Sequence, residues 1–257
     1  MSADRHSMVR IFVAGAALNA VIAVVFAALI FIDSRQLLGI SAWVKPLKFA
    51  VTSFVYLGTL ALFARHLPDS LDETKGNRAA WIISAMIFGE VFFIGLQSAR
   101  GVTSHFNQKT LIDGIIYSVM GVMIIVNTVV FIRVFRHFFR GEQKISGAYL
   151  SGIRWGAVLF VIGSVVGGAM SGLNRHTIGI ADGGPGLPLV NFSTVAGDLR
   201  IAHFVGLHAL QVLPFLGWLI ARSAPARAMT AAGIVYTVAF VFVLVQAFLA
   251  QPLLRMS

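Results

Sequence analysis

The chain has 257 residues, of which 58% are hydrophobic and 12% charged, and Lys and Arg outnumber Asp and Glu by 20 to 10. A soluble domain usually carries about a quarter charged residues, so this composition excludes an ordinary soluble protein and predicts a membrane protein. Because cysteine is absent, disulfides, thiolate nucleophiles and cysteine-bound metals are excluded as well.

Seven segments are apolar and about long enough to cross a hydrocarbon layer of ~30 Å as helices. We therefore expect an all-α, polytopic membrane protein with a single domain over residues 1–257. The second segment is short, but Lys48 and Arg65 at its ends can extend their stems to the membrane surface. In chain order, the predicted helices cover residues 11–32, 47–65, 79–99, 113–132, 153–174, 200–221 and 228–251.

The distribution of basic residues predicts the orientation of the chain. Of the 20 Lys and Arg residues, 12 lie in the tail and loops on the N-terminal side of the predicted membrane, and eight lie on the opposite side. By the positive-inside rule, the N-terminus is cytoplasmic and the C-terminus is outside, in an inner membrane of the bacterial type. The basic residues then set the orientation of the chain and contact anionic lipid head groups. We therefore expect the bilayer as a partner, and not nucleic acid.

Glu90, in the stretch "AMIFGEVFFIGLQSARG", lies near the middle of the third predicted helix. Inserting an ionisable residue at that depth costs at least ~2.5 kcal/mol, so such a residue normally faces the protein interior and has a partner. Gln97 follows seven residues later and shares the same helix face, and Arg100 comes at the outer end. We interpret Glu90 as functional, and a structural hydrogen bond between helices is the alternative.

Small residues are spaced four apart in the fifth predicted helix, "GAVLFVIGSVVGGAMSG". Gly163 and Gly167 form one pair, and Gly168 and Gly172 form another. Because small residues at this spacing let helix backbones approach closely in lipid, we predict a packing role for this helix.

The sixth predicted helix, within "GDLRIAHFVGLHALQVLP", carries the second polar face. Turning ~100° per residue places Arg200, His203, His208 and Gln211 within an arc of about 140°, and the last two lie at the depth of Glu90. We predict that this face meets the polar face of the third helix and lines a cleft open to the outer side. Asp198 suits an N-cap as well as this cleft.

The outer loops add the polar motifs "WVKPLKF" and "SARGVTSHFNQ". In the first motif, Trp43 and Pro46 also suit a purely structural role at a membrane surface and a helix start. The acid and base groups that we expect are Glu90, His105, His203 and His208. The groups that we expect to bind substrate are Lys45, Lys48, Gln97, Arg100, Asn107, Asp198, Arg200 and Gln211.

A buried acid beside imidazoles favours an integral membrane enzyme that does acid/base chemistry on a lipophilic small molecule with an anionic head group. A divalent metal held by His and Glu stays open, although His203 and His208 are five residues apart, whereas two metal ligands on one helix favour a spacing of three or four. The first alternative is a proton-coupled transporter of a small amphiphile. A weak three-plus-one-plus-three repeat supports it, with "GLQSA" matching "LVQAF". The second alternative is a non-catalytic sensor or assembly partner.

Overall fold

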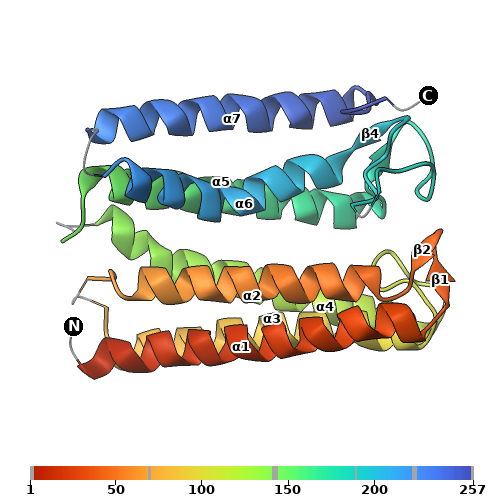
Figure 1. Ribbon diagram of the computed structural model, residues 1–257, viewed down its shortest axis with the longest axis horizontal. Helices are drawn as coiled ribbons and strands as arrows, with labels where there is room; N and C mark the ends of the chain where they lie inside the picture. The colour runs from red at the N-terminus through yellow and green to blue at the C-terminus, as the bar shows by residue number, and fades with distance from the viewer. Residues whose placement is uncertain (1–2, 69–70, 141–143, 189, 222–224, 256–257) are drawn as a thin grey trace. The chain divides into compact units, whose positions relative to one another are not determined.

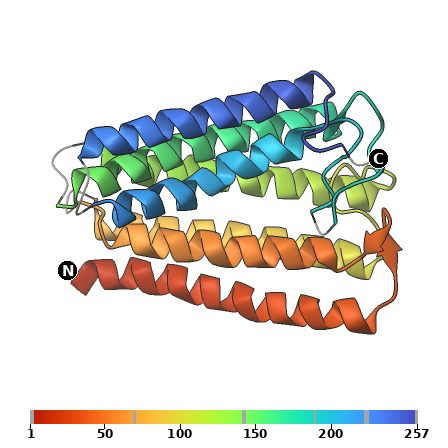
Figure 2. The same ribbon diagram turned by 45° about the horizontal axis from the view of Figure 1, so that its top comes forward.

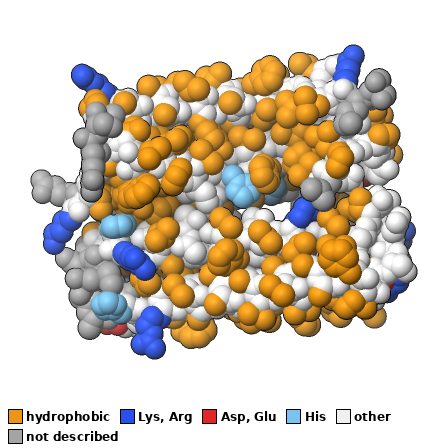
Figure 3. Space-filling model, viewed as in Figure 1, with side chains coloured by type: hydrophobic (Ala, Val, Ile, Leu, Met, Phe, Trp, Pro, Cys, Tyr) orange, Lys and Arg blue, Asp and Glu red, His pale blue; other side chains and the backbone are white. Residues whose placement is uncertain are grey.

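The computed structural model describes residues 3–68, 71–140, 144–188, 190–221 and 225–255. Within these ranges it is helical apart from connecting segments and two small two-stranded sheets, and seven helices are long and apolar enough to cross a membrane. Apolar side chains dominate the helix surfaces in view, and most of the visible Lys and Arg side chains lie toward the helix ends (Figure 3). The predicted all-α class and helix number are confirmed. Arg222 and the side chain of Arg5, both counted for the orientation, lie outside the described part.

The chain separates into two compact units, Met1–Arg140 and Gly141–Ser257, and each is described by itself. The prediction of a single domain stays a prediction. Unit 1 contains α1 (Ala3–Ile32), β1 (Gln36–Leu37), β2 (Ile40–Ser41), α2 (Val44–Ala64), α3 (Glu73–Ala99), α4 (Leu111–Phe135) and the 3-10 helix η1 (Arg136–Phe139). Unit 2 contains α5 (Gly147–Leu173), β3 (Thr177–Ile178), β4 (Gly197–Asp198), α6 (Leu199–Leu219) and α7 (Ala226–Phe248).

The helix α3 begins at Glu73, six residues before its predicted start, and both α3 and α6 begin directly after a polar cap. The Asp72 carboxylate accepts a hydrogen bond from the Lys75 backbone N–H at 2.9 Å and so starts α3. Asp198 accepts the Arg200 backbone N–H at 3.0 Å and starts α6. The capping role predicted for Asp198 is therefore confirmed.

Both units present the same order of elements: a long helix, two short strands that pair antiparallel, a second helix and a third helix. In unit 1, α2 packs side by side with α1, and in unit 2, α6 packs side by side with α5 (Figures 1 and 2). The third helix of each unit, α3 or α7, contacts both of the others. Unit 1 then continues into α4, so the element order follows the predicted three-plus-one-plus-three pattern.

The third helices of the two units also end in the same way. In α3, the N–H of Val102 donates to the carbonyl of Gln97, and Gly101 has a positive φ of 73°. In α7, the N–H of Gln251 donates to the carbonyl of Gln246, and Ala250 has a positive φ of 58°. Both are C-caps in which a left-handed residue redirects the chain. The match between the two glutamine motifs therefore extends to backbone geometry.

The core of unit 1 lies where its helices meet. Ala23, Ala50 and Val91 form a buried cluster that joins α1, α2 and α3. Ile94 packs against Ile116 and Met120 of α4 in a second cluster. Since Glu90 directly precedes Val91, these two clusters hold its stretch of α3 in the interior.

In unit 2, α5 and α6 approach each other backbone to backbone. A Cβ at Gly163 would lie 2.8 Å from the carbonyl carbon of Gly206, and a Cβ at Gly156 would lie 2.7 Å from the carbonyl oxygen of Ala209. The predicted packing role is thus confirmed for Gly163. In contrast, a Cβ at Gly168 would meet nothing within 4 Å. Only part of the small-residue pattern is used for close approach.

The hairpin of unit 1 is anchored by Asp33 and Arg35. The Asp33 carboxylate accepts hydrogen bonds from Arg35 Nε at 3.0 Å and from Trp43 Nε1 at 2.8 Å. Arg35 Nη1 also donates to the Ala99 carbonyl at 2.9 Å, which satisfies a carbonyl in the last turn of α3. The hydrogen bonds from Arg35, and then from Trp43, hold the pKa of Asp33 well below its usual range.

We expect the substitution Asp33→Asn to flatten the acid dependence of stability. A carboxyl whose pKa is lowered by folding stabilises the folded state above its unfolded pKa of about 4, and this contribution is lost as the pH falls through the folded pKa. The melting temperature of the wild-type protein should therefore fall more steeply below about pH 4 than that of the variant. Thermal unfolding in detergent at a series of acidic pH values measures this. Parallel profiles would contradict it.

Candidate functional site

The centre of the candidate site is Glu90. Nine residues before the end of α3, it lies ~13 Å from that end along the helix axis. Its side chain is only 6% exposed, and its Oε1 is 3.5 Å from Nε2 of His105. The other oxygen, Oε2, is buried and has no hydrogen-bond partner among the described residues. Because only one oxygen of this buried carboxyl group has a partner, the other oxygen can form a hydrogen bond or exchange a proton with another group.

The loop between α3 and α4 brings His105 to Glu90. The loop reverses direction through Gly101 and Phe106, both of which have positive φ angles. Inside the loop, Asn107 Nδ2 donates to the Thr103 carbonyl at 3.0 Å. The Ser104 hydroxyl lies 3.2 Å from Nδ1 of His105. The imidazole is therefore held through Nδ1 by its own loop and faces the carboxylate with Nε2.

A buried polar network joins the two ends of this loop. Arg100 Nη1 donates to Asp113 Oδ1 at 2.6 Å and also to Gln97 Oε1. Gln97 Nε2 donates to the same Asp113 oxygen at 3.0 Å, and the Thr110 hydroxyl donates to Asp113 Oδ2 at 2.7 Å. The Asp113 side chain is only 3% exposed. In the structure, Gln97 and Arg100 thus hold the two ends of the loop together through Asp113. A role in binding substrate stays a prediction for both.

Aromatic side chains surround the His105 imidazole. Its ring centroid lies 5.6 Å from that of Phe49, 6.2 Å from that of Phe106 and 6.2 Å from that of Tyr117. The ammonium of Lys45 lies 5.9 Å from the Phe49 ring centroid, and its charge acts on Glu90. The site therefore combines an acid, a base and a cation with apolar walls, which suits an amphiphilic ligand.

Two histidines of unit 2, His203 and His208, lie on α6. His203 Nδ1 lies 2.7 Å from the carbonyl oxygen of Gly163 on α5. Because a carbonyl only accepts, Nδ1 carries a proton, and in the neutral ring Nε2 keeps its lone pair. His208 contacts Phe204, with ring centroids 4.2 Å apart, and hydrogen-bonds to Gln211.

Asp198 and Arg200 link the start of α6 to the connection that precedes it. The fully buried Asp198 carboxylate accepts hydrogen bonds from Arg200 Nε at 2.9 Å and from the Ser193 N–H at 2.9 Å. His176, to which the sequence assigned no role, lies 3.4 Å from Asp182 and 3.8 Å from Asp198. These contacts bind the 174–198 connection to the start of α6, and a substrate role for Asp198 and Arg200 stays a prediction.

The structure brings together Glu90, His105 and Lys45 within unit 1, while Asn107 supports the loop and Lys48 lies one turn further along α2. The predicted contact between Glu90 and His208 joins different units and stays a prediction. Among the described residues, no three His, Asp or Glu side chains are grouped as a metal site requires. The sequence reasoning missed two residues, Asp113 and Tyr117. The Thr-x-x-Asp spacing at the start of α4 is a capping signal that could have singled out Asp113.

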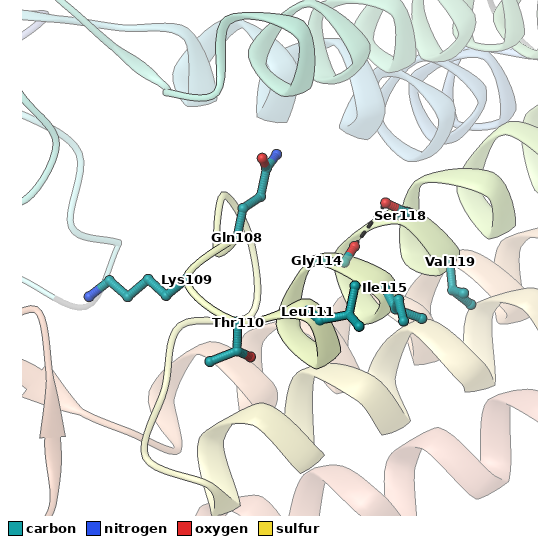
Figure 4. Close-up of a pocket in the computed structure, with 8 residues that line it drawn as sticks. All are labelled: Gln108, Lys109, Thr110, Leu111, Gly114, Ile115, Ser118 and Val119. Carbon is teal, nitrogen blue, oxygen red and sulfur yellow. Dashed lines mark hydrogen bonds between the residues drawn. The ribbon is translucent and has the colours of Figure 1, made fainter.

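An open depression lies beside this loop at the start of α4 (Figure 4). It is lined by Gln108, Lys109, Thr110, Leu111, Gly114, Ile115, Ser118 and Val119. Leu111 and Ile115 are exposed there, and the Ser118 hydroxyl already donates to the Gly114 carbonyl at 2.8 Å. With apolar walls and one cation, the depression suits contact with lipid better than proton chemistry.

Comparisons with models of protein families, with curated proteins and with solved structures found no match to this chain.

Proposed function

We propose that the protein is an integral membrane enzyme that performs acid/base chemistry on a lipophilic small molecule with an anionic head group. The contact between Glu90 and His105 carries this proposal. A carboxyl group held deep in an apolar helix is costly, and an imidazole 3.5 Å away gives it a partner for proton exchange. Helix packing alone would require neither a buried carboxyl group at Glu90 nor a Ser104 hydroxyl that holds the His105 imidazole beside it.

Each remaining group has a part in the proposed chemistry. Glu90 and His105 would take up and return the proton of the reacting group. Lys45 would attract the anionic head, and Phe49 and Phe106 would contact the apolar body. The proposed orientation, with a cytoplasmic N-terminus in a bacterial-type inner membrane, turns this end of α3 outward. His203 and His208 would extend the site from α6.

A second candidate is a proton-coupled transporter of a small amphiphile. The shared element order of the two units favours it, together with the matching ends of α3 and α7. Parallel repeats of this kind occur in several transporter folds, where a buried acid carries the coupled proton. Glu90 and His105 would then bind the proton instead of moving it within a substrate.

We expect Glu90→Gln to lower the rate of either process by about 10²- to 10⁴-fold, since the amide keeps the shape but exchanges no proton. His105→Ala and His208→Ala should also lower it. The protein is reconstituted into proteoliposomes with a bacterial lipid extract, and lipids are followed by mass spectrometry in both leaflets. A chemically altered lipid supports the enzyme, and an unaltered lipid that changes leaflet with proton uptake supports the transporter.

Glu73→Gln is the matched control, because it makes the same change at an exposed position at the start of α3. It should behave as the wild-type protein does. Full activity in a folded Glu90→Gln variant would remove the proposed site. Elemental analysis of protein purified without added metal tests a metal-assisted version, which requires a stoichiometric metal.

A further inference from the structure

Two residues that contact the His105 imidazole each carry a buried polar atom that has no hydrogen-bond partner among the described residues. These atoms are Oε2 of Glu90 and the hydroxyl of Tyr117. Glu90 contacts His105 through its other oxygen, and the Tyr117 ring lies 6.2 Å from the His105 ring. Buried polar groups are normally paired, because leaving one unpaired costs folding free energy. Two such residues around one imidazole point to a place where a further polar group binds.

The surrounding charges restrict what that group can be. Burial around the Glu90 carboxyl group disfavours an additional anion at this point, and the charge of Lys45, which acts on Glu90, disfavours a cation. One neutral group can satisfy both atoms: a hydroxyl, which donates to Oε2 of Glu90 and accepts from the Tyr117 hydroxyl. Phe49 and Phe106 on the remaining sides suit an apolar body.

We propose that Glu90 and Tyr117 together bind the hydroxyl group of a lipophilic alcohol. This inference rests on the proposed function, in which that hydroxyl would be the reacting group and any anionic head would lie outward at Lys45. It assigns Tyr117 a role in binding. A water molecule bridging the two atoms would satisfy them equally well, and the experiment below separates the two cases.

Tyr56 provides a matched control within the same unit. Its buried hydroxyl donates to Oδ1 of Asn127 at 3.3 Å, so it already has a partner. Tyr56→Phe leaves the Asn127 oxygen without that donor and should lower the melting temperature. Tyr117→Phe removes an unpaired hydroxyl, so without ligand this variant should melt no lower than the wild-type protein.

The test uses a long-chain alkanol that carries a photoreactive diazirine in its chain, added to the full-length protein in detergent. Cross-linked peptides are identified by mass spectrometry. We expect labelling of the loop and of the start of α4, with competition by n-dodecanol and much weaker competition by n-dodecyl methyl ether, which lacks a donor. In Tyr117→Phe, the n-dodecanol concentration for half competition should rise about fivefold or more, and in Tyr56→Phe it should not change.

Several outcomes would overturn the proposal: labelling elsewhere only, equal competition by the ether, or an unchanged concentration in Tyr117→Phe. If a water molecule bridges the two atoms instead, n-dodecanol should show no specific competition, and this result would also overturn the proposal. Dodecylammonium serves as a charged probe, and stronger competition by it than by n-dodecanol would contradict a neutral group. Because binding needs no turnover, alcohol binding together with an active Glu90→Gln variant would reject the proposed function and leave this inference standing.

Discussion

The substitution Gly163→Ala is expected to destabilise the protein by about 1–3 kcal/mol, the usual cost of forcing an extra methyl group into a packed interface. The new Cβ would lie 2.8 Å from the backbone of Gly206, and backbone atoms cannot turn aside as a flexible side chain does. The helices α5 and α6 would have to separate. The change would also shift the Gly163 carbonyl that accepts the hydrogen bond from His203.

The same substitution at Gly168, on the same helix, is the matched control. A Cβ there meets nothing within 4 Å, and alanine has the higher helix propensity, so Gly168→Ala should leave stability unchanged or raise it by up to ~1 kcal/mol. Thermal unfolding of both variants in one detergent measures the difference. Equal melting temperatures would show that α5 and α6 do not make this close approach.

We expect Asp113→Ala to free the loop that carries His105. Removing the carboxylate leaves the Arg100 guanidinium, the Gln97 amide and the Thr110 hydroxyl without their shared acceptor. Hydrogen bonds to charged groups are worth enough that backbone hydrogen exchange in residues 101–110 should accelerate by about 10- to 100-fold. Hydrogen exchange followed by mass spectrometry of loop peptides provides the measurement.

Asp72→Ala is the control for this second result, because Asp72 caps the opposite end of α3. Its removal should speed exchange at the start of α3 and leave the loop unchanged. If the loop stays protected in Asp113→Ala, the network does not hold His105 in place. A faster loop together with reduced activity would link the network to the Glu90–His105 contact.

The local features of unit 1 were predictable to different degrees. Hydropathy placed α3 and marked Glu90 as a buried ionisable residue, since both depend on a continuous stretch of sequence. The tasks of Gln97 and Arg100 were less accessible. Their polar character predicts a site. The residue that accepts their hydrogen bonds is Asp113, which lies beyond a loop. The path of that loop depends on two residues with positive φ, Gly101 and Phe106.

In unit 2, spacing predicted close packing for both glycine pairs of α5, and the structure uses Gly163 for it but not Gly168. A spacing of four residues places small side chains on one stripe of a helix, and two such stripes look alike in sequence. Which stripe meets a neighbour depends on how α6 lies against α5. The capping role of Asp198 was accessible because a cap is formed within a few residues.

Composition and hydropathy by themselves determined that the described part of the chain forms seven long apolar helices and where the apolar core of each one lies, because these properties arise from neighbouring residues. Only the tertiary structure decided that His105 is a partner of Glu90 within unit 1, and that Tyr117 borders the same ring. These contacts join residues 12 and 15 positions apart through a folded loop. Their formation depends on three-dimensional packing, which periodicity and charge patterns do not encode.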